Sequence, residues 1–440
     1  MTIALPYVST RGSAPEVAIG QAIRDGAAPD GGLYLPATVP AIDLLALRGL
    51  DALPDFAARF LAPFFAGDPL AAELDAICRE AFDFPIAMVT PDPARPALTV
   101  LELFHGPTGA FKDFGARFLM ACFDRLGDPA QPLTVLVATS GDTGGAVGCA
   151  AEGRKAVQAA ILYPRGRVSA FQELQLTCWN APVQAFEVEG DFDDCQRMVK
   201  AAFADKRLSA ALRLTSANSI NIGRLLPQAA YLAFAAARRF EETGIAPGLL
   251  IPTGNLGHGF AAVYARLAGA PIGPIVAVTN ANRTLSEWHR SGVYAPGPSI
   301  ATIANAMDVG APSNFERLMH LPEEARRIGV VRVDDDTIRT RIRTEYDRSG
   351  YIWDPHSATA AEAFDRMDAA EKGDRPWIAA ATAHPYKFAD VVEPVIGINI
   401  APPPALEAIL GRTARKVAIA AEDAALTDAL TSSFGAKAPV

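Results

Sequence analysis

The chain has 440 residues, half of them hydrophobic, so it is long enough to bury a large core and to divide into two or three compact units. Its 49 acidic and 40 basic residues give a formal net charge of -9. They are spread without a Lys/Arg run, which argues against a nucleic-acid or anionic-membrane partner. The five cysteines are far apart and form no CxxC pair, so we expect reduced core thiols rather than disulfides or a thiolate zinc site.

The first residues, MTIALPYVSTRG, contain neither a basic segment nor a long apolar one, so we expect no secretion signal and a cytoplasmic protein. The most apolar helical stretch, residues 225–237, is interrupted by Pro227. It is also shorter than the roughly 20 residues that a membrane span needs. Nothing in the sequence specifies an oligomeric state.

Hydrophobic spacing is mostly helical before residue 85, and four prolines between residues 85 and 96 then predict a stiff connector. From residue 98 onward, short β-branched or leucine-rich runs alternate with stretches at helical spacing, which is typical of an α/β protein with a largely parallel sheet. Strands are predicted at 98–104, 133–138, 157–163, 183–188, 249–251 and 275–278, with helices at 113–126 and from residue 144.

These patterns predict three units. The mostly helical N-terminal portion covers residues 1–90 and ends at the proline-rich connector. Residues 91–240 and 241–440 form the other two, separated by a boundary that only Gly244, Pro247 and Gly248 mark.

Three segments rich in Gly, Ser, Thr and Asn stand at predicted strand-to-helix turns. They are HGPTGAFKDFG from His105, TSGDTGG from Thr139 and PTGNLGHG from Pro252. In an open parallel sheet such turns gather at one edge, where ligands bind. We therefore expect the three segments to form one site.

The segment PTGNLGHG is suited to an anion. The residues Gly254, Asn255, Leu256 and Gly257 can point backbone N–H groups at a phosphate, and the start of the following helix adds partial positive charge. The segment is neither a GxGxxG fingerprint nor a P-loop, and by itself it also fits a plain tight turn.

A second anion site is possible at TSGDTGG. Hydroxyls of Thr139, Ser140 and Thr143 stand there beside glycines at the head of a helix. The alternative is a capped helix start with Asp142 or Thr143 as the N-cap residue.

The lysine of the first segment has the surroundings of a nucleophile. Lys112 stands between Phe111 and Phe114 at a predicted helix start, where both desolvation and the positive helix end disfavour the ammonium form. A neutral amine is what an aldehyde cofactor needs to bind covalently. The alternative is a solvated lysine on an amphipathic helix.

Together these motifs resemble those of the threonine synthases, pyridoxal 5′-phosphate (PLP) enzymes of the tryptophan synthase β class. HGPTGAFKDFGARF resembles their lysine motif, and DGGLYLP is typical of them rather than of cysteine synthases or dehydratases. The other similar segments, in the family's order, are YVSTRG, TSGDTG, NSIN, PTGNLG, NAMDVGAPSNFERL and TAHPYKF. The resemblance implies PLP fold type II, with largely parallel sheets and flanking helices in two domains beside a mostly helical N-terminal portion.

The resemblance also implies roles for individual residues. Lys112 would carry PLP and move protons at Cα, Cβ and Cγ of O-phosphohomoserine, giving threonine and phosphate. The loop from Gly254 to Gly257 would hold the cofactor phosphate, Thr382 would face the pyridine nitrogen, and TSGDTG, including Asp142, would contact the substrate and the cofactor ring. Ser219 and Arg224, with Thr143, would hold the substrate phosphate.

Two other functions stay open. A phospholyase would use the same substrate but release 2-oxobutyrate, and a non-catalytic relative would use the pocket only for binding. The sequence departs from the family at Gly109, where Leu is frequent, and at His258, where an Asp commonly follows the glycine loop. His258, His356 and His384 lack metal-ligand spacing, so we expect satisfied loop histidines and no metal.

Overall fold

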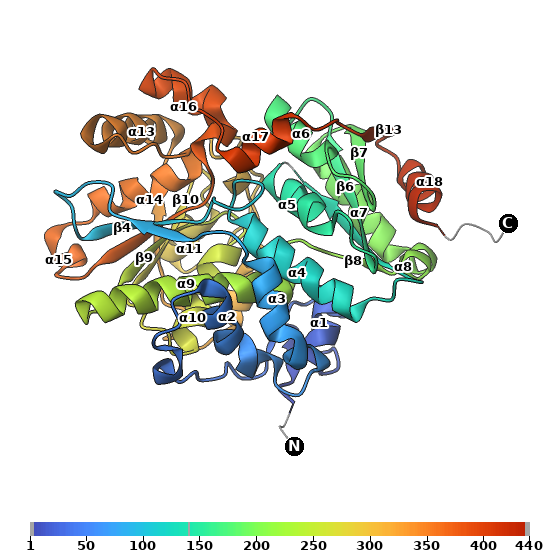
Figure 1. Cartoon of the computed structure of the whole chain (residues 1–440), viewed down its shortest axis with the longest axis horizontal. Helices are drawn as coiled ribbons and strands as arrows, with labels where there is room; N and C mark the ends of the chain where they lie inside the picture. Colours follow the sequence, from blue (N-terminus) through green and yellow to red (C-terminus); the bar gives the residue numbers. More distant parts are fainter. Residues whose placement is uncertain (1–3, 140, 436–440) are drawn as a thin grey trace.

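The computed structural model describes residues 4–139 and 141–435. Two largely parallel sheets lie side by side with helices on their faces, and the N-terminal elements pack beneath them (Figure 1). This arrangement confirms the predicted α/β class.

The larger sheet has six strands. In spatial order they are β11 (Gly329–Arg332), β10 (Ile275–Thr279), β9 (Gly248–Pro252), β12 (Trp377–Ala381), β4 (Leu98–Glu102) and β3 (Ala87–Val89). All neighbours are parallel except β3, which runs antiparallel to β4 at the edge. At the centre, Ala379 of β12 lies opposite Leu250 of β9 and Val100 of β4. The carboxyl ends of these central strands therefore meet at one edge.

The second sheet has five parallel strands. Their order is β13 (Lys416–Ala420), β7 (Val183–Glu189), β6 (Val157–Pro164), β5 (Leu133–Ala138) and β8 (Leu214–Thr215). The chain enters this sheet after β4, returns to the first sheet at β9, and reaches β13 only near its end. Each sheet thus combines segments that are distant in the sequence. The division of the chain into units at 1–90, 91–240 and 241–440 stays a prediction.

Buried helices join the two sheets. α4 (Lys112–Leu126) packs against α5 (Asp142–Ala151) and α9 (Ile222–Thr243), and α9 packs against α10 (Gly257–Leu267). Residues 222–237 of α9 are all buried, although Pro227 removes one backbone donor inside the helix. The predicted helix at 113–126 is confirmed, and Gly127 follows it as its C-cap residue.

The N-terminal portion is mostly helical, as predicted. It contains the two-stranded antiparallel sheet of β1 (Tyr7–Ser9) and β2 (Tyr34–Pro36), the helices α1 (Ile19–Asp25), α2 (Leu53–Leu61) and α3 (Leu74–Ala81), and the 3-10 turns η1 (Leu44–Leu47), η2 (Ala62–Phe65) and η3 (Pro69–Glu73). α2 packs on α9 and α3 on α4. This portion therefore covers the helices that carry the central part of the site.

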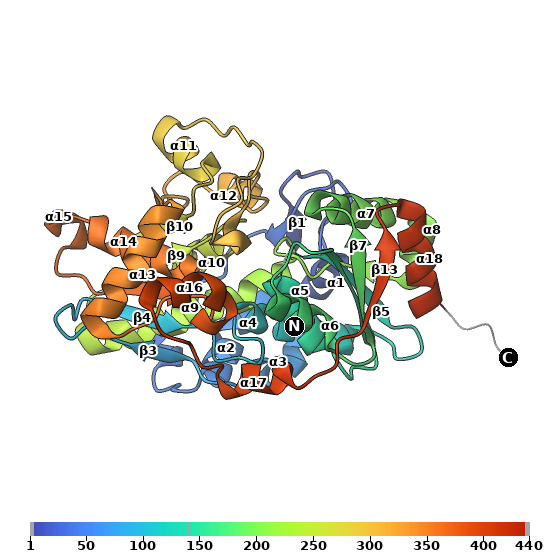
Figure 2. The same ribbon diagram turned by 90° about the horizontal axis from the view of Figure 1, so that it is seen from above.

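The remaining helices lie around the two sheets. They are α6 (Ala170–Thr177), α7 (Phe192–Ala204), α8 (Lys206–Leu212), α11 (Thr284–Ser291), α12 (Phe315–His320), α13 (Asp335–Ser349), α14 (Pro355–Arg366), α15 (Ala369–Lys372), α16 (Ala389–Ile396), α17 (Pro404–Leu410) and α18 (Asp423–Phe434), with the short turns η4 (Asn305–Met307) and η5 (Pro385–Phe388). α11 and α12 stand out from the body of the molecule in Figure 2. Within the described part of the chain, no helix is both long and apolar enough to cross a membrane.

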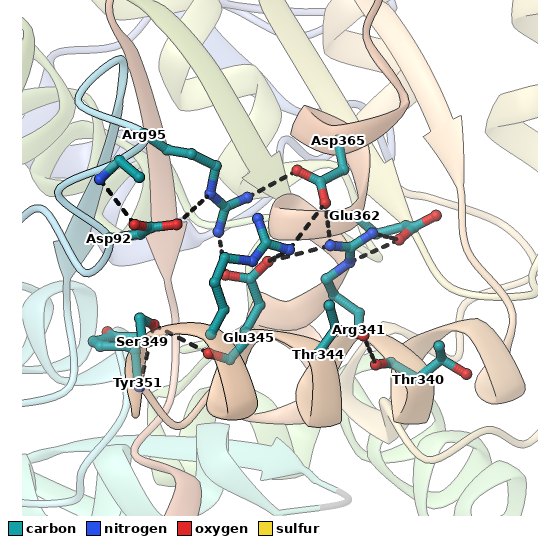
Figure 3. Close-up of polar contacts among 12 residues, drawn as sticks. Asp92, Arg95, Thr340, Arg341, Thr344, Glu345, Ser349, Tyr351, Glu362 and Asp365 are labelled. Atoms are coloured by element: carbon teal, nitrogen blue, oxygen red, sulfur yellow. Dashed lines mark hydrogen bonds and ion pairs between the residues drawn. The ribbon is translucent and has the colours of Figure 1, made fainter.

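An ion cluster ties the proline-rich connector to α13 and α14 (Figure 3). Arg95 of the connector contacts Asp92 at 3.1 Å and Asp365 of α14 at 2.8 Å, and it also pairs with Glu345 of α13. Arg341 of α13 pairs with Glu345, Asp365 and Glu362. These contacts fix the chain just before β4, the strand that leads to the lysine motif.

Candidate active site

A cavity opens where the two sheets meet, and the three glycine-rich segments converge on it. Its wall contains the N-terminus of α4, the head of α5, the start of α9 and the turn between β9 and α10. η4, the head of α14 and the segment after β12 complete it. Of the predicted site residues, those that line the cavity are Lys112, Asp142, Ser219, Arg224, Gly254, Asn255, Gly257 and Thr382. The structure therefore brings residues from all three segments to one cavity, as expected from the sequence.

Lys112 is the first residue of α4, and its Nζ lies 4.5 Å from the centre of the Phe111 ring. Burial, helped by the nearby positive charge of Arg224 and opposed by Asp142, lowers its pKa from 10.5 to about 8. At pH 7 a pKa of about 8 leaves roughly a tenth of the amine neutral, far more than for a lysine with its ordinary pKa. The alternative of a fully solvated lysine is wrong.

The turn that presents Lys112 depends on Gly109, one of the two departures from the family pattern. Gly109 has φ 67°, a conformation that suits glycine, and its N–H donates to the Gly106 carbonyl at 3.1 Å. Its own carbonyl accepts from the His384 N–H at 2.9 Å. The lysine motif is thereby bonded directly to the TAHPYKF segment.

The glycine turn after β9 is shaped for close backbone approach. A Cβ placed on Gly254 would stand 2.6 Å from the Cα of Met307, so only glycine fits there without movement. Leu256 adopts φ 57° and is wholly buried; it does not line the cavity and serves to anchor the turn. The side chain of Asn255 is already engaged: its NH2 group donates to Ser219 Oγ, and its carbonyl oxygen accepts from the Ser313 N–H. The groups that the turn offers a ligand are thus mainly backbone N–H groups at the head of α10.

The segment TSGDTGG uses Thr139 internally. Its Oγ1 accepts from the N–H groups of Gly141 and Gly144 at 3.1 and 3.0 Å, which holds the turn in shape. Neither Thr139 nor Thr143 lines the cavity, and Ser140 lies outside the described residues. The alternative that Asp142 or Thr143 is the N-cap is wrong, because Gly141 has that position and α5 starts at Asp142.

Sequence reasoning missed Lys387, which is buried and forms an ion pair of 3.1 Å with Asp142. Its Nζ also donates to the Thr108 carbonyl at 2.8 Å and to the side chain of Gln175. Burial alone would raise the pKa of Asp142, but Lys387 and other nearby positive groups make the net shift downward. Asp142 therefore stays ionised at the cavity wall. Lys387 lies inside the motif TAHPYKF, which was the available signal.

Arg224 enters the cavity from α9 and is 2% exposed. One guanidinium nitrogen donates to the Ala217 carbonyl at 2.6 Å, whereas Nε has no hydrogen-bond partner among the described residues. Burial lowers the pKa of Arg224 to about 10, so it is still charged at neutral pH. A Cβ on Gly115 of α4 would come within 2.7 Å of this Nε, and the glycine makes room for the arginine.

Thr382 closes the cavity after β12 and is buried. Its N–H donates to Ser357 Oγ at 2.8 Å, and the two hydroxyl oxygens lie 3.4 Å apart. Ser357 in turn donates to Asp354. This chain of bonds fixes the Thr382 hydroxyl at the cavity wall.

The prediction of satisfied loop histidines holds only for His384, which caps η5. His356 is bonded to Asp354 and to the Ala306 N–H, but it lies in α14. His258 lies in α10, and neither of its ring nitrogens has a hydrogen-bond partner of ordinary geometry among the described residues. His258 is therefore neither a loop residue nor a satisfied one, and for it the prediction is wrong in both respects.

Comparison with known proteins agrees with this geometry. Residues 94–382 match the model of pyridoxal-phosphate dependent enzymes, and residues 6–82 and 357–430 match the N-terminal and C-terminal models of threonine synthase. The threonine synthase of Serratia marcescens is 37% identical over 96% of this chain and 95% of its own length, and that of Escherichia coli is 38% identical over 87% and 89%. This chain belongs to the threonine synthase family.

Solved structures agree as well. The crystal structure of PLP-bound threonine synthase from Brucella melitensis superposes with a TM-score of 0.89 at 33% identity, covering 98% of this chain and all of that one. The threonine synthase of Escherichia coli gives 0.88 at 33%, covering 97% of this chain and all of that one. The fold is thus that of the type II PLP enzymes, and this family member is a PLP-dependent lyase.

The residues of the cavity also fit PLP, independently of these similarities. Its walls and their immediate neighbours carry buried polar atoms without a hydrogen-bond partner of ordinary geometry among the described residues, on Arg224, Gln228, Tyr231 and His258. Buried polar groups ordinarily find partners, so such a group marks a ligand site. An amine of lowered pKa beside a glycine turn at a helix head suits an aldehyde that bears a phosphate.

Proposed function

We propose that this enzyme converts O-phospho-L-homoserine and water to L-threonine and inorganic phosphate. The observation that supports this substrate most directly is a second place for an anion in the same cavity. Arg224 and Ser219 line it together with Lys112 and the glycine turn. A substrate with its own phosphate needs such a second place, whereas a dehydratase or a cysteine synthase does not.

In this proposal Lys112 would hold PLP until the amino group of the substrate displaces it, and the amine freed in this way is the proton carrier. Lys112 is the one lysine among the described residues that line the cavity. With a pKa of about 8, its amine can accept a proton and return it near neutral pH. Lys112 removes the protons at Cα and Cβ of the substrate and delivers a proton to Cγ after phosphate leaves. Water then supplies the hydroxyl at Cβ, and a proton returned to Cα completes threonine.

The bound cofactor supplies an electron sink that stabilises negative charge next to the amino-bearing carbon. Thr382 offers a neutral hydroxyl to the ring nitrogen and so does not force its protonation. The backbone N–H groups from Gly254 to Gly257 hold the cofactor phosphate. Asp142, kept ionised by Lys387, faces the substrate and the ring from the head of α5.

Arg224 and Ser219 bind the phosphate of the substrate. A guanidinium makes strong charge-assisted hydrogen bonds to phosphate oxygens, and the buried Nε of Arg224 has a free donor among the described contacts. The resemblance also assigned this role to Thr143. Thr143 does not line the cavity, so the structure gives this role no support.

A phosphate-release assay on O-phosphohomoserine, with threonine and 2-oxobutyrate measured in parallel, tests the proposal. We expect equimolar threonine and phosphate. An excess of 2-oxobutyrate would identify the phospholyase instead, and PLP binding without phosphate release would favour a non-catalytic relative. The variant K112A should lose turnover and the visible absorbance of covalently bound PLP, and unaltered turnover in K112A would overturn the assignment.

A further inference from the structure

His258 has the placement of a ligand-binding residue that the assignments above leave unused. It is the second residue of α10, directly after the glycine turn, it is 3% exposed, and it lines the same cavity as Lys112. Backbone N–H groups at this end of the helix face the same region, and the turn from residue 252 to 257 contains no Lys or Arg.

Aromatic contacts fix the orientation of the imidazole. It stacks on Phe111 with ring centres 4.7 Å apart and planes 19° apart, and it meets the Tyr231 ring edge-on at 5.7 Å. The stack on Phe111 covers one face of the imidazole, and the ring nitrogens have no hydrogen bond of ordinary geometry among the described residues. A buried imidazole held in this way is poorly satisfied by the protein alone.

The imidazole is neutral at physiological pH. Burial, with a smaller contribution from the positive charge of Lys112, lowers its pKa to about 3, although the Pro252 carbonyl opposes the shift. The contact with Pro252 falls short of hydrogen-bond geometry and fixes no tautomer. Either ring nitrogen can therefore carry the single N–H and donate it to an anion.

We propose that His258 is an additional ligand of the phosphate held by the turn from Gly254 to Gly257, donating its imidazole N–H to a phosphate oxygen. This inference rests on the proposed role of the turn in cofactor binding. A neutral donor at this position adds a bond to a turn that otherwise offers a ligand mainly backbone N–H groups. His258 would then bind the phosphate of the cofactor and Lys112 its aldehyde carbon, and the Phe111 ring contacts both side chains.

The test uses holoenzyme without substrate, so it is independent of the reaction catalysed. His258→Phe keeps a ring against Phe111 and removes both nitrogens, His258→Gln restores a donor, and His289→Phe on the exposed surface of α11 is the control. We expect His258→Phe to weaken PLP binding about tenfold, as loss of one hydrogen bond to a charged group would. The ³¹P resonance of the bound phosphate should move, His258→Gln should recover most of the affinity, and His289→Phe should match the parent.

Wild-type enzyme labelled with ¹⁵N-histidine supplies a second measurement that does not depend on a folded variant. We expect one imidazole N–H proton that is protected from exchange with PLP bound and exchanges freely once PLP is removed. Parental PLP affinity and an unchanged ³¹P resonance in His258→Phe would overturn the proposal, as would the absence of a protected imidazole proton in the wild type. If these results are as expected but no threonine forms, only the proposed reaction fails.

Discussion

The side-chain amide of Asn255 donates a hydrogen bond of 2.5 Å to the hydroxyl of Ser219. This bond joins the glycine turn proposed for the cofactor phosphate to the segment proposed for the substrate phosphate. Asn314 strengthens the link, because its amide donates to the backbone carbonyls of both Asn255 and Ser219 at 3.1 and 3.2 Å. The two anion sites are therefore mechanically connected, and a change in one should be felt in the other.

Replacing Ser219 with Ala should affect the substrate more than the cofactor. The variant loses the hydroxyl that we propose contacts the substrate phosphate, and a hydrogen bond to a charged group contributes about 1.5–3 kcal/mol, so we expect KM for O-phosphohomoserine to rise about tenfold or more. PLP affinity should fall by a smaller factor, because Asn255 keeps its bond to Ser313. Steady-state kinetics and PLP titration measure the two effects. Ser216→Ala is the control, since Ser216 is buried nearby but does not line the cavity.

Covalent attachment of PLP to the apoenzyme should depend on pH through Lys112. Only the neutral amine reacts, and burial lowers its pKa from 10.5 to about 8. The second-order rate should therefore rise with pH and level off above about 8. Stopped-flow absorbance measures this rate. Arg224→Met removes a positive neighbour and should move the midpoint upward; an unchanged midpoint would mean that Arg224 does not act on Lys112.

Much of the site could be predicted from the sequence because local chain geometry dictates it. Glycines at strand-to-helix turns and a lysine between two aromatic residues are local patterns, and parallel strands bring such turns to one edge. The environment of Lys112 was predictable for this reason.

Long-range contacts were not predictable. Thr139 has the same side chain whether it binds a ligand or, as here, holds its own turn together. Lys387 is far in sequence from Asp142, and only the approach of the two sheets pairs them. His258 looks like an ordinary loop residue until α10 and the ring of Phe111 enclose it. Each of these outcomes depends on packing between elements from different parts of the chain.

Removing Lys387 should destabilise the protein, because it leaves the carboxylate of Asp142 buried without its cationic partner. We expect K387M to lower the free energy of unfolding by about 3–5 kcal/mol. The double variant D142N/K387M should recover part of this loss, since it removes the unpaired charge. Urea denaturation measures the differences. K206M on the exposed start of α8 is the control and should stay within about 0.5 kcal/mol of the parent. A K387M protein as stable as the parent would mean that the pair is not formed.

The ion cluster of the connector should support stability without affecting chemistry. Glu345 is 1% exposed and contacts the guanidinium groups of Arg95, Arg341 and Arg348. E345Q removes one carboxylate, but Arg95 and Arg341 keep other acidic partners, so we expect a loss of about 1–3 kcal/mol in the free energy of unfolding.

The matched control for E345Q lies on the same helix. Asp347 pairs with Arg343 at 2.8 Å, but both side chains are about half exposed, so D347N should cost less than about 1 kcal/mol. The parent, E345Q and D347N should have the same kcat and KM at temperatures where all are folded, because no described residue of the cluster lines the cavity. A drop in kcat for folded E345Q would instead mean that the connector transmits strain through β4 to Lys112.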